Sequence, residues 1–199
     1  MFTGIIENVG IVRAVRPKGT SMEFEIACPF ADELKVDQSL AHNGVCLTVE
    51  QVNPPVYKVT AIRETLQKSN LGNLEAGSVV NLERCMIAGA RLDGHLVLGH
   101  VEAQGECVSI SEVRGSWEMR FRYPAEYSGL LVEKGSVCLN GISLTVYNVT
   151  ADQFSVGIIP YTYEQTNIKE LQPGSVVNLE FDIIGKYVQR NLAFREQGY

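Results

Sequence analysis

The sequence has few basic residues. It contains 17 Lys and Arg against 23 Asp and Glu among 199 residues, which gives a formal net charge of −6. A protein that binds nucleic acid normally needs a basic face that displaces counterions from the phosphates. The charge balance therefore disfavours nucleic acid as a partner.

Long apolar runs and export signals are also missing. No stretch approaches the roughly 20 apolar residues that span a bilayer, and residues 1–4 lack the charged and apolar regions of a signal peptide. The five cysteines show no CxxC spacing, and no HExxH motif or Cys/His cluster indicates a metal site. We therefore expect a cytoplasmic protein with reduced thiols, no membrane span and no bound metal.

An internal repeat is the strongest feature that is present. The residues GSVVNLE at 77–83 recur letter for letter at 174–180, an offset of 97. The same offset aligns 43–49 with 140–146, and an offset of 95 aligns 4–10 with 99–105. Several anchors in one order make chance similarity implausible, so the sequence predicts a duplicated domain.

Each copy has the pattern of short β-strands. Apolar and polar residues alternate over 22–28 and over 117–123, which places one face in a core and the other in water. Asn-Gly pairs at 43–44 and 140–141 are typical of tight turns. Strands separated by Gly, Pro and Asn favour a barrel or sandwich over βαβ units. Short helical turns are expected at 64–70 and 161–167.

A single helix is expected at the end of the chain, with no counterpart after the first copy. Ile184, Val188 and Leu192 share one helical face with Tyr187. This apolar stripe must be buried, either by self-association of the chain or against its own barrel, and the pattern does not distinguish these two outcomes.

Five stretches of the sequence resemble riboflavin synthases, and together they extend over residues 1–192 in the order of that family. They are residues 1–7, 42–49, 94–101, 140–146 and 182–187. The resemblance implies an all-β fold of two tandem six-stranded Greek-key antiparallel barrels with a C-terminal α-helix. It implies an N-terminal lumazine-binding barrel at 1–87, a C-terminal one at 88–182, and a trimerisation helix and tail at 183–199.

The resemblance also implies a reaction. Riboflavin synthases are transferases that convert two molecules of 6,7-dimethyl-8-ribityllumazine into riboflavin and 5-amino-6-ribitylaminouracil by four-carbon transfer, without a cofactor. The implied assembly is a homotrimer held by the C-terminal helix, with the site between the N-terminal barrel of one subunit and the C-terminal barrel of its neighbour. An association with lumazine synthase is left open. Two related pockets suit a reaction in which donor and acceptor are the same compound.

Substrate-binding residues are implied in matching segments of both copies. They are Gly4, Ile5, Ile6, Ser39, Cys46, Leu47, Thr48, Thr60, Ala61, Ile62, Arg63, Glu64, Thr65, Gly99, His100, Val101, Lys134, Ser143, Leu144, Thr145, Gly157, Ile158, Ile159, Pro160, Tyr161 and Thr162.

Five residues are the catalytic candidates: Cys46, His100, Ser143, Thr145 and Asp182. His100 is the first choice for proton transfer near neutral pH. Simpler interpretations are core packing for Cys46, an ordinary β-branched strand residue for Thr145 and a helix N-cap for Asp182. The resemblance favours a functional role for each of them.

Three other polar residues have plain interpretations. His42 and His95 are taken as structural histidines, and on one continuous strand the odd spacing of His95 and His100 would place them on opposite faces. Lys134 is a solvated surface charge unless the resemblance makes it a ligand contact.

Two other classes of protein compete with the enzyme. Lumazine proteins and yellow fluorescent proteins share the duplicated barrel but bind a lumazine or flavin as a fluorophore. Both copies here carry pocket motifs and the terminal helix is present, which favours the enzyme. An oligonucleotide-binding barrel is disfavoured, because the chain is acidic and lacks interleaved basic and aromatic residues.

Overall fold

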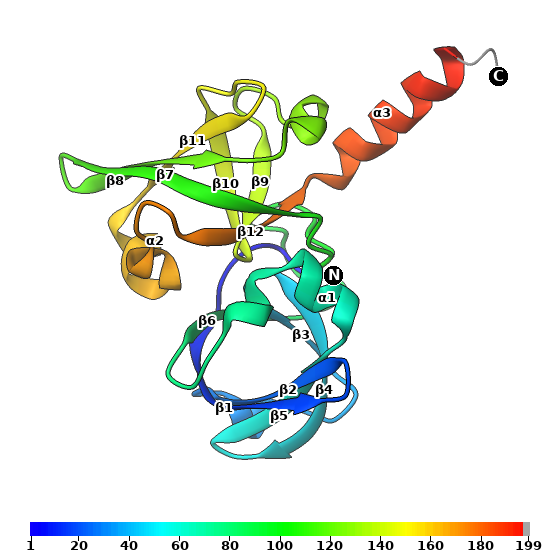
Figure 1. Ribbon diagram of the computed structural model, residues 1–199, viewed down its shortest axis with the longest axis vertical. Coiled ribbons are helices and arrows are strands. Elements are labelled where there is room, and N and C mark those ends of the chain that lie inside the picture. The colour runs from blue at the N-terminus through cyan, green and yellow to red at the C-terminus, as the bar shows by residue number, and fades with distance from the viewer. Residues whose placement is uncertain (197–199) are drawn as a thin grey trace.

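The computed structural model describes residues 1–196 and contains two closed six-stranded antiparallel barrels and a C-terminal helix (Figure 1). The first barrel is formed by β1 (Asn8–Lys18), β2 (Ser21–Ala27), β3 (Ser39–His42), β4 (Val45–Asn53), β5 (Val56–Ala61) and β6 (Val79–Arg84). Its strands follow the order β1-β2-β5-β4-β3-β6. Because β5 and β4 lie between β2 and β3, the chain makes a Greek-key crossing.

The second barrel repeats this order as β7-β8-β11-β10-β9-β12. Its strands are β7 (Ala103–Val113), β8 (Ser116–Arg122), β9 (Ser136–Leu139), β10 (Ile142–Tyr147), β11 (Gln153–Ile158) and β12 (Val176–Phe181). Even a local irregularity recurs, since the register shifts between Val12 and Ala14 and again between Cys107 and Ser109. The predicted duplication is confirmed.

Short helices connect the strands, and those at 63–73 and 160–170 lie where short helical turns were expected. They are η1 (Ala31–Glu33), α1 (Arg63–Lys68), η2 (Asn70–Asn73), η3 (Ala125–Leu130), α2 (Pro160–Gln165), η4 (Asn167–Glu170) and the terminal α3 (Ile183–Glu196). In Figure 1, α3 projects away from the second barrel. Residues 197–199, which were assigned to the tail, lie outside the described residues. Within the described part of the chain, no helix is long and apolar enough to cross a bilayer.

The two Asn-Gly pairs form tight hairpin turns that meet back to back. Asn43 and Gly44 have φ of 47° and 78°, and Asn140 and Gly141 have 46° and 83°, the paired positive values of a type I′ turn. A Cβ on Gly44 would lie 2.8 Å from the backbone nitrogen of Gly141. Glycine at these positions therefore allows the two barrels to touch through their backbones.

A reciprocal asparagine network joins the barrels. The backbone N–H of Asn70 donates to Oδ1 of Asn178 at 2.6 Å, and that of Asn167 donates to Oδ1 of Asn81 at 2.8 Å. Each bond links the short helix of one barrel to the last strand of the other. Because buried amide groups need partners, these bonds fix how the two barrels are oriented.

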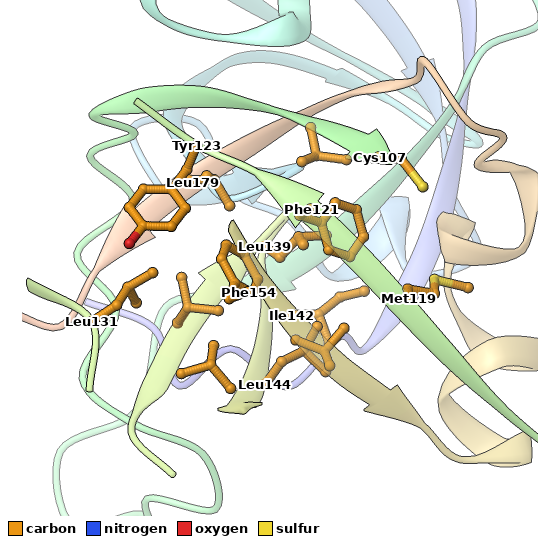
Figure 2. Packing of buried hydrophobic residues seen from close by; sticks show 14 of the residues in the cluster. Cys107, Met119, Phe121, Tyr123, Leu131, Leu139, Ile142, Leu144, Phe154 and Leu179 are labelled. Atoms are coloured by element: carbon orange, nitrogen blue, oxygen red, sulfur yellow. The ribbon is translucent and has the colours of Figure 1, made fainter. Parts of the chain in front are cut away.

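Each barrel has its own hydrophobic core, and the predicted alternation is confirmed. Phe24 and Ile26 of β2 and Met119 and Phe121 of β8 are buried. Figure 2 shows Phe121 beside Phe154 and Leu139 in the second core. The alternate residues of these strands face outward.

A buried histidine in the first barrel makes its stability depend on pH. Nε2 of His42 lies 2.8 Å from the Tyr57 hydroxyl, and Nδ1 lies 3.0 Å from the carbonyl of Leu40. Burial lowers the pKa of His42 to about 4 from an ordinary value of 6.5. The unfolded chain therefore binds a proton that the folded chain excludes, and stability falls as the pH drops from 6.5 towards 4.

We expect His42 to contribute a loss of about 3 kcal/mol in unfolding free energy between pH 7 and pH 4. Chemical denaturation at several pH values measures this slope. H42Q should flatten it, whereas H100Q, which changes an exposed histidine, should retain it. Equal slopes in the wild type and H42Q would contradict the assignment.

Candidate functional site

Two segments outside the strands cross to the opposite barrel. The backbone N–H of Ser143, in the second barrel, donates to the carbonyl of Gly4 at 2.7 Å, and that of Cys46, in the first, donates to Gly99 at 2.9 Å. A Cβ on Gly4 would lie 2.6 Å from Cβ of Ser143, and a Cβ on Gly99 would lie 2.6 Å from Cβ of Cys46. Residues 4–6 thus border the second barrel and residues 99–101 border the first.

The crossing segments also pair with each other. Phe2 N–H donates to the Val97 carbonyl at 2.7 Å, and Val97 N–H donates back at 3.1 Å. Both side chains are fully buried and cluster with Ala41 and Cys138 between the barrels. This small core holds the two segments in a fixed relation to each other.

The first pocket brings together several expected residues on the N-terminal barrel. It has a volume of about 210 Å³ and is lined by Val45, Cys46, Glu64, Thr65, Lys68, Ser69, Gly99, His100 and Val101. Three of these residues were not expected from the sequence: Val45 at the start of β4, and Lys68 and Ser69 at the end of α1. Closed ligand pockets usually measure about 300–1,000 Å³, so this chain alone would cover a ligand here only in part.

The thiol of Cys46 is neutral near pH 7. Burial raises its pKa above the ordinary value, and the nearby Ser39 hydroxyl opposes this only in part. Ser39 lies opposite Thr48 in the β3–β4 register. Because the thiolate is the nucleophilic form, this environment suits a polar contact with a ring.

The matching strands of the second barrel present hydroxyl groups on their outer face. Ser143 is half-buried and Thr145 is exposed, and Thr145 lies opposite Ser136 in the β9–β10 register. Lys134 is exposed, and its Nζ lies 5.2 Å from the centre of the Tyr147 ring. At the start of α2, Tyr161 is 72% exposed, so it is free to contact a ligand.

Ser143 has a histidine partner that the sequence did not suggest. Nδ1 of His95 lies 2.7 Å from Oγ of Ser143. Burial lowers the pKa of His95, while the charge of Asp182 opposes this lowering. A neutral imidazole can accept the hydroxyl proton, so the pair can activate an oxygen nucleophile or orient a hydrogen-bond donor.

His95 and His100 do not lie on one continuous strand, contrary to what was assumed from the sequence. Residues 98–102 form no strand, and within 94–102 only Val97 makes an isolated bridge, to Phe2. His95 faces the second barrel through Ser143, whereas His100 lines the pocket of the first. The two histidines therefore serve different pockets.

Four of the expected binding residues have side chains in the barrel cores. They are Leu47, Ala61, Leu144 and Ile158, and Figure 2 shows Leu144 among the core residues of the second barrel. Their neighbours in the strands face outward. These four residues can therefore reach a ligand only through their backbones.

Asp182 directly precedes the terminal helix. Its Oδ1 accepts a hydrogen bond from the N–H of Ile184 at 2.9 Å, which confirms the expected N-cap. It also lines a mostly apolar groove of about 540 Å³ between η3 and α3, together with Leu130, Val188 and Leu192. Asp182 therefore caps the helix and borders this groove, and its charge also acts on the pKa of His95.

Sequence reasoning missed two buried carboxylates, Glu83 and Glu180. Glu83 accepts hydrogen bonds from the crossing segment at residues 3–4, and Glu180 accepts them from the segment at 98–100. Burial raises the pKa of Glu83, and hydrogen bonds from Thr3 and Gly4 oppose the rise. The signal was present in the sequence, because each residue ends one copy of GSVVNLE.

Two homologous barrels, each with outward-facing polar strands bordered by a crossing segment, define a duplicated small-molecule-binding protein. The lumazine binding domain family matches the chain twice, at residues 3–85 and 98–182. The chain is 44% identical over 197 residues to riboflavin synthase of Mycobacterium tuberculosis (strain ATCC 25618 / H37Rv), covering 96% of this chain and 97% of the relative. It is 39% identical over 193 residues to that of Actinobacillus pleuropneumoniae, covering 96% and 90%. The chain belongs to the riboflavin synthase family.

Solved structures share the fold at lower identity. LumP complexed with riboflavin superposes with a TM-score of 0.85 at 21% identity, covering 91% of this chain and 99% of LumP. LumP complexed with 6,7-dimethyl-8-(1'-D-ribityl) lumazine gives a TM-score of 0.82 at 22% identity, covering 90% and 98%. At this identity the similarity establishes the duplicated barrel fold.

Proposed function

We propose that this chain catalyses the dismutation of two molecules of 6,7-dimethyl-8-ribityllumazine to riboflavin and 5-amino-6-ribitylaminouracil. The observation that carries the proposal is the presence of two homologous ligand-binding faces in a chain of the riboflavin synthase family. One lumazine gives up a four-carbon unit and an identical one accepts it. Holding both in register replaces a bimolecular encounter, which can lower the barrier by about 7–11 kcal/mol.

The working site is proposed to lie between subunits of a homotrimer, with the first barrel of one subunit facing the second barrel of its neighbour. The small open pocket around Cys46 supports this arrangement, since a second surface must cover the ligand. The apolar stripe of α3 also supports it, because Ile184, Val188 and Leu192 are 63%, 54% and 54% exposed. Burial of such a stripe favours association.

The catalytic roles are proposed from position. His100 lines the first pocket and is exposed, so it can remove the acidic proton of the 7-methyl group of the donor. Ser143, paired with a histidine on which the charge of Asp182 acts, can add to or polarise the acceptor ring. Cys46, Thr48 and Thr145 are then ring or ribityl contacts on the two opposed faces.

The same proposal places the reaction in the cytoplasm. All five cysteines are free thiols, and Cys28, Cys107 and Cys138 are buried. Burial raises the pKa of Cys28 and of Cys107 to about 11, so these two stay protonated and inert. A chain with five unpaired cysteines is typical of a reducing compartment.

The direct test is turnover without any addition. Purified protein incubated with 6,7-dimethyl-8-ribityllumazine alone should form riboflavin, measured by its fluorescence, with one riboflavin for every two lumazines consumed. Heat-denatured protein is the control. Tight stoichiometric binding of the lumazine without turnover would instead identify a fluorophore-binding protein of the same fold.

A further inference from the structure

The two buried glutamates lie at equivalent places in the repeat. Glu83 is 4% exposed and Glu180 is 3% exposed, and neither forms an ion pair among those found in the described residues. A buried carboxylate is costly unless hydrogen bonds satisfy its oxygens. Their hydrogen-bond partners therefore show what these residues hold in place.

Glu83 holds the N-terminal segment. Its Oε1 accepts bonds from the N–H of Thr3 at 2.6 Å and from the Thr3 hydroxyl at 2.7 Å, and its Oε2 accepts one from the N–H of Gly4 at 3.0 Å. The carbonyl of Gly4 in turn accepts the N–H of Ser143. One residue, Gly4, thus links the carboxylate of the first barrel to the pocket strand of the second through its N–H and its carbonyl.

Glu180 holds the other segment in the same way. Its Oε1 accepts a bond from the N–H of Leu98 at 2.6 Å, and its Oε2 accepts bonds from Gly99 and His100, both at 2.9 Å. The carbonyl of Gly99 accepts the N–H of Cys46. The carboxylate of the second barrel is therefore linked to the pocket strand of the first.

The register of the strands makes this exchange regular. Glu83 pairs with Ala41 across β6 and β3, and Ala41 pairs with Cys46 across β3 and β4. In the second barrel, Cys138 pairs with both Glu180 and Ser143. Each glutamate thus shares a row of residues with the pocket residue of its own barrel, yet it binds the segment that borders the other pocket.

We propose that Glu83 and Glu180 are positioning residues, each of which sets the geometry of the pocket on the opposite barrel. Glu83 holds residues 3–4 against Ser143, and Glu180 holds residues 98–100, with the backbone of His100, against Cys46. The inference rests on the proposed function for the identity of the ligand. Each pocket accordingly depends on a carboxylate that the other barrel supplies.

Hydrogen exchange with riboflavin as the probe tests this inference. The variants are E83Q and E180Q. In each, an amide nitrogen replaces one carboxylate oxygen, and this nitrogen cannot accept the hydrogen bond from a backbone N–H that the oxygen accepted. E180Q should weaken riboflavin binding at the first pocket about tenfold. Riboflavin should then protect peptides covering Cys46 and residues 60–65 much less than in the wild type, while protection at Ser143 and residues 157–162 remains. E83Q should give the reverse pattern.

A matched control is E7Q. Glu7 also accepts a backbone N–H across the strands, from Arg84 at 2.7 Å, but it touches neither crossing segment in the hydrogen bonds of the described residues. Protection at both pockets should persist in this variant. T3A removes the hydroxyl bond to Glu83 and the bond that the Ile5 N–H donates to the same hydroxyl at 3.3 Å, and it should weaken the second pocket even if E83Q folds poorly.

The outcomes separate the inference from the proposed function. Loss of protection at the pocket of the same barrel, equal loss at both, or no loss at either would overturn the crossed positioning. If riboflavin protects both pockets of the wild-type protein but the protein forms no riboflavin from the lumazine, the proposed enzymatic function is contradicted. The effect of each glutamate on the opposite pocket could still be measured in that case, because riboflavin binding and hydrogen exchange at residues 3–4 and 98–100 need no turnover.

Discussion

A chain that ends at Ile183 should be a folded monomer whose turnover is reduced at least a hundredfold. The barrels should survive the truncation, because no residue of α3 belongs to either buried core cluster. What is lost is the surface that brings the first barrel of one subunit against the second barrel of another. Orientation of this kind is worth about 7–11 kcal/mol in comparable reactions, so even partial loss gives a large effect.

Light scattering after size exclusion measures the mass, and riboflavin fluorescence measures the turnover. The variant I184S/V188S/L192S is a sharper companion, since it keeps the helix length and removes only the apolar stripe. It should give the same monomer and the same loss of rate. Replacement of the exposed Arg195 by Ser, at the end of the same helix, should change neither. A truncated monomer with full activity would rule out a site between subunits.

The duplication and the barrel could be predicted because they are written in local patterns. Two copies of GSVVNLE at a fixed offset require a repeat, and the alternation at 22–28 and 117–123 requires strands with one buried face. The same alternation separates the outward Cys46 and Ser143 from the inward Leu47 and Leu144. The offset of the repeat and the alternation of apolar residues are sufficient to predict these features, because each feature depends on residues that are close together in the sequence or recur at a fixed offset.

The crossing of the two segments could not be predicted in this way. Residues 2–4 and 97–99 carry no periodic pattern, and their partners lie more than forty residues away in sequence, as Gly4 with Ser143 and Gly99 with Cys46 show. Strand geometry was assumed for His95 and His100, but the segment is irregular there. The hydrogen bond between His95 and Ser143 is consequently visible only in three dimensions.

The positioning glutamates were hidden for a related reason. In an alternating strand, a Glu that follows an apolar residue is the usual sign of a solvent-exposed face. Here that face of β6 and β12 is covered by the crossing segments, so Glu83 and Glu180 are buried. Exact recurrence of a charged residue at the end of both motif copies was the only hint that the sequence offered.

Replacement of Ser143 by Ala should reduce turnover about a hundredfold or more while riboflavin binding and the melting temperature change little. The hydroxyl lies 2.7 Å from Nδ1 of His95, and burial lowers the pKa of that histidine, so the imidazole is neutral at pH 7 and able to accept a proton. General acid–base partners of this kind contribute about 10²–10⁴ to rates. S155A is a suitable control, because its buried hydroxyl in the same barrel has no hydrogen-bond partner among the described residues.

A double-mutant cycle with His95 shows whether the two residues act as a unit. H95Q should lower the rate by a factor similar to that of S143A, and the double variant should be no slower than either single one, since removing one partner already disables the pair. The low pKa of His95 adds a second signature. The part of the wild-type rate that depends on this pair should persist as the pH falls below 6.5, the ordinary histidine value, and should be lost only below the folded-state pKa. Single variants whose effects multiply would show that Ser143 and His95 act separately, with His95 serving only to shape the pocket.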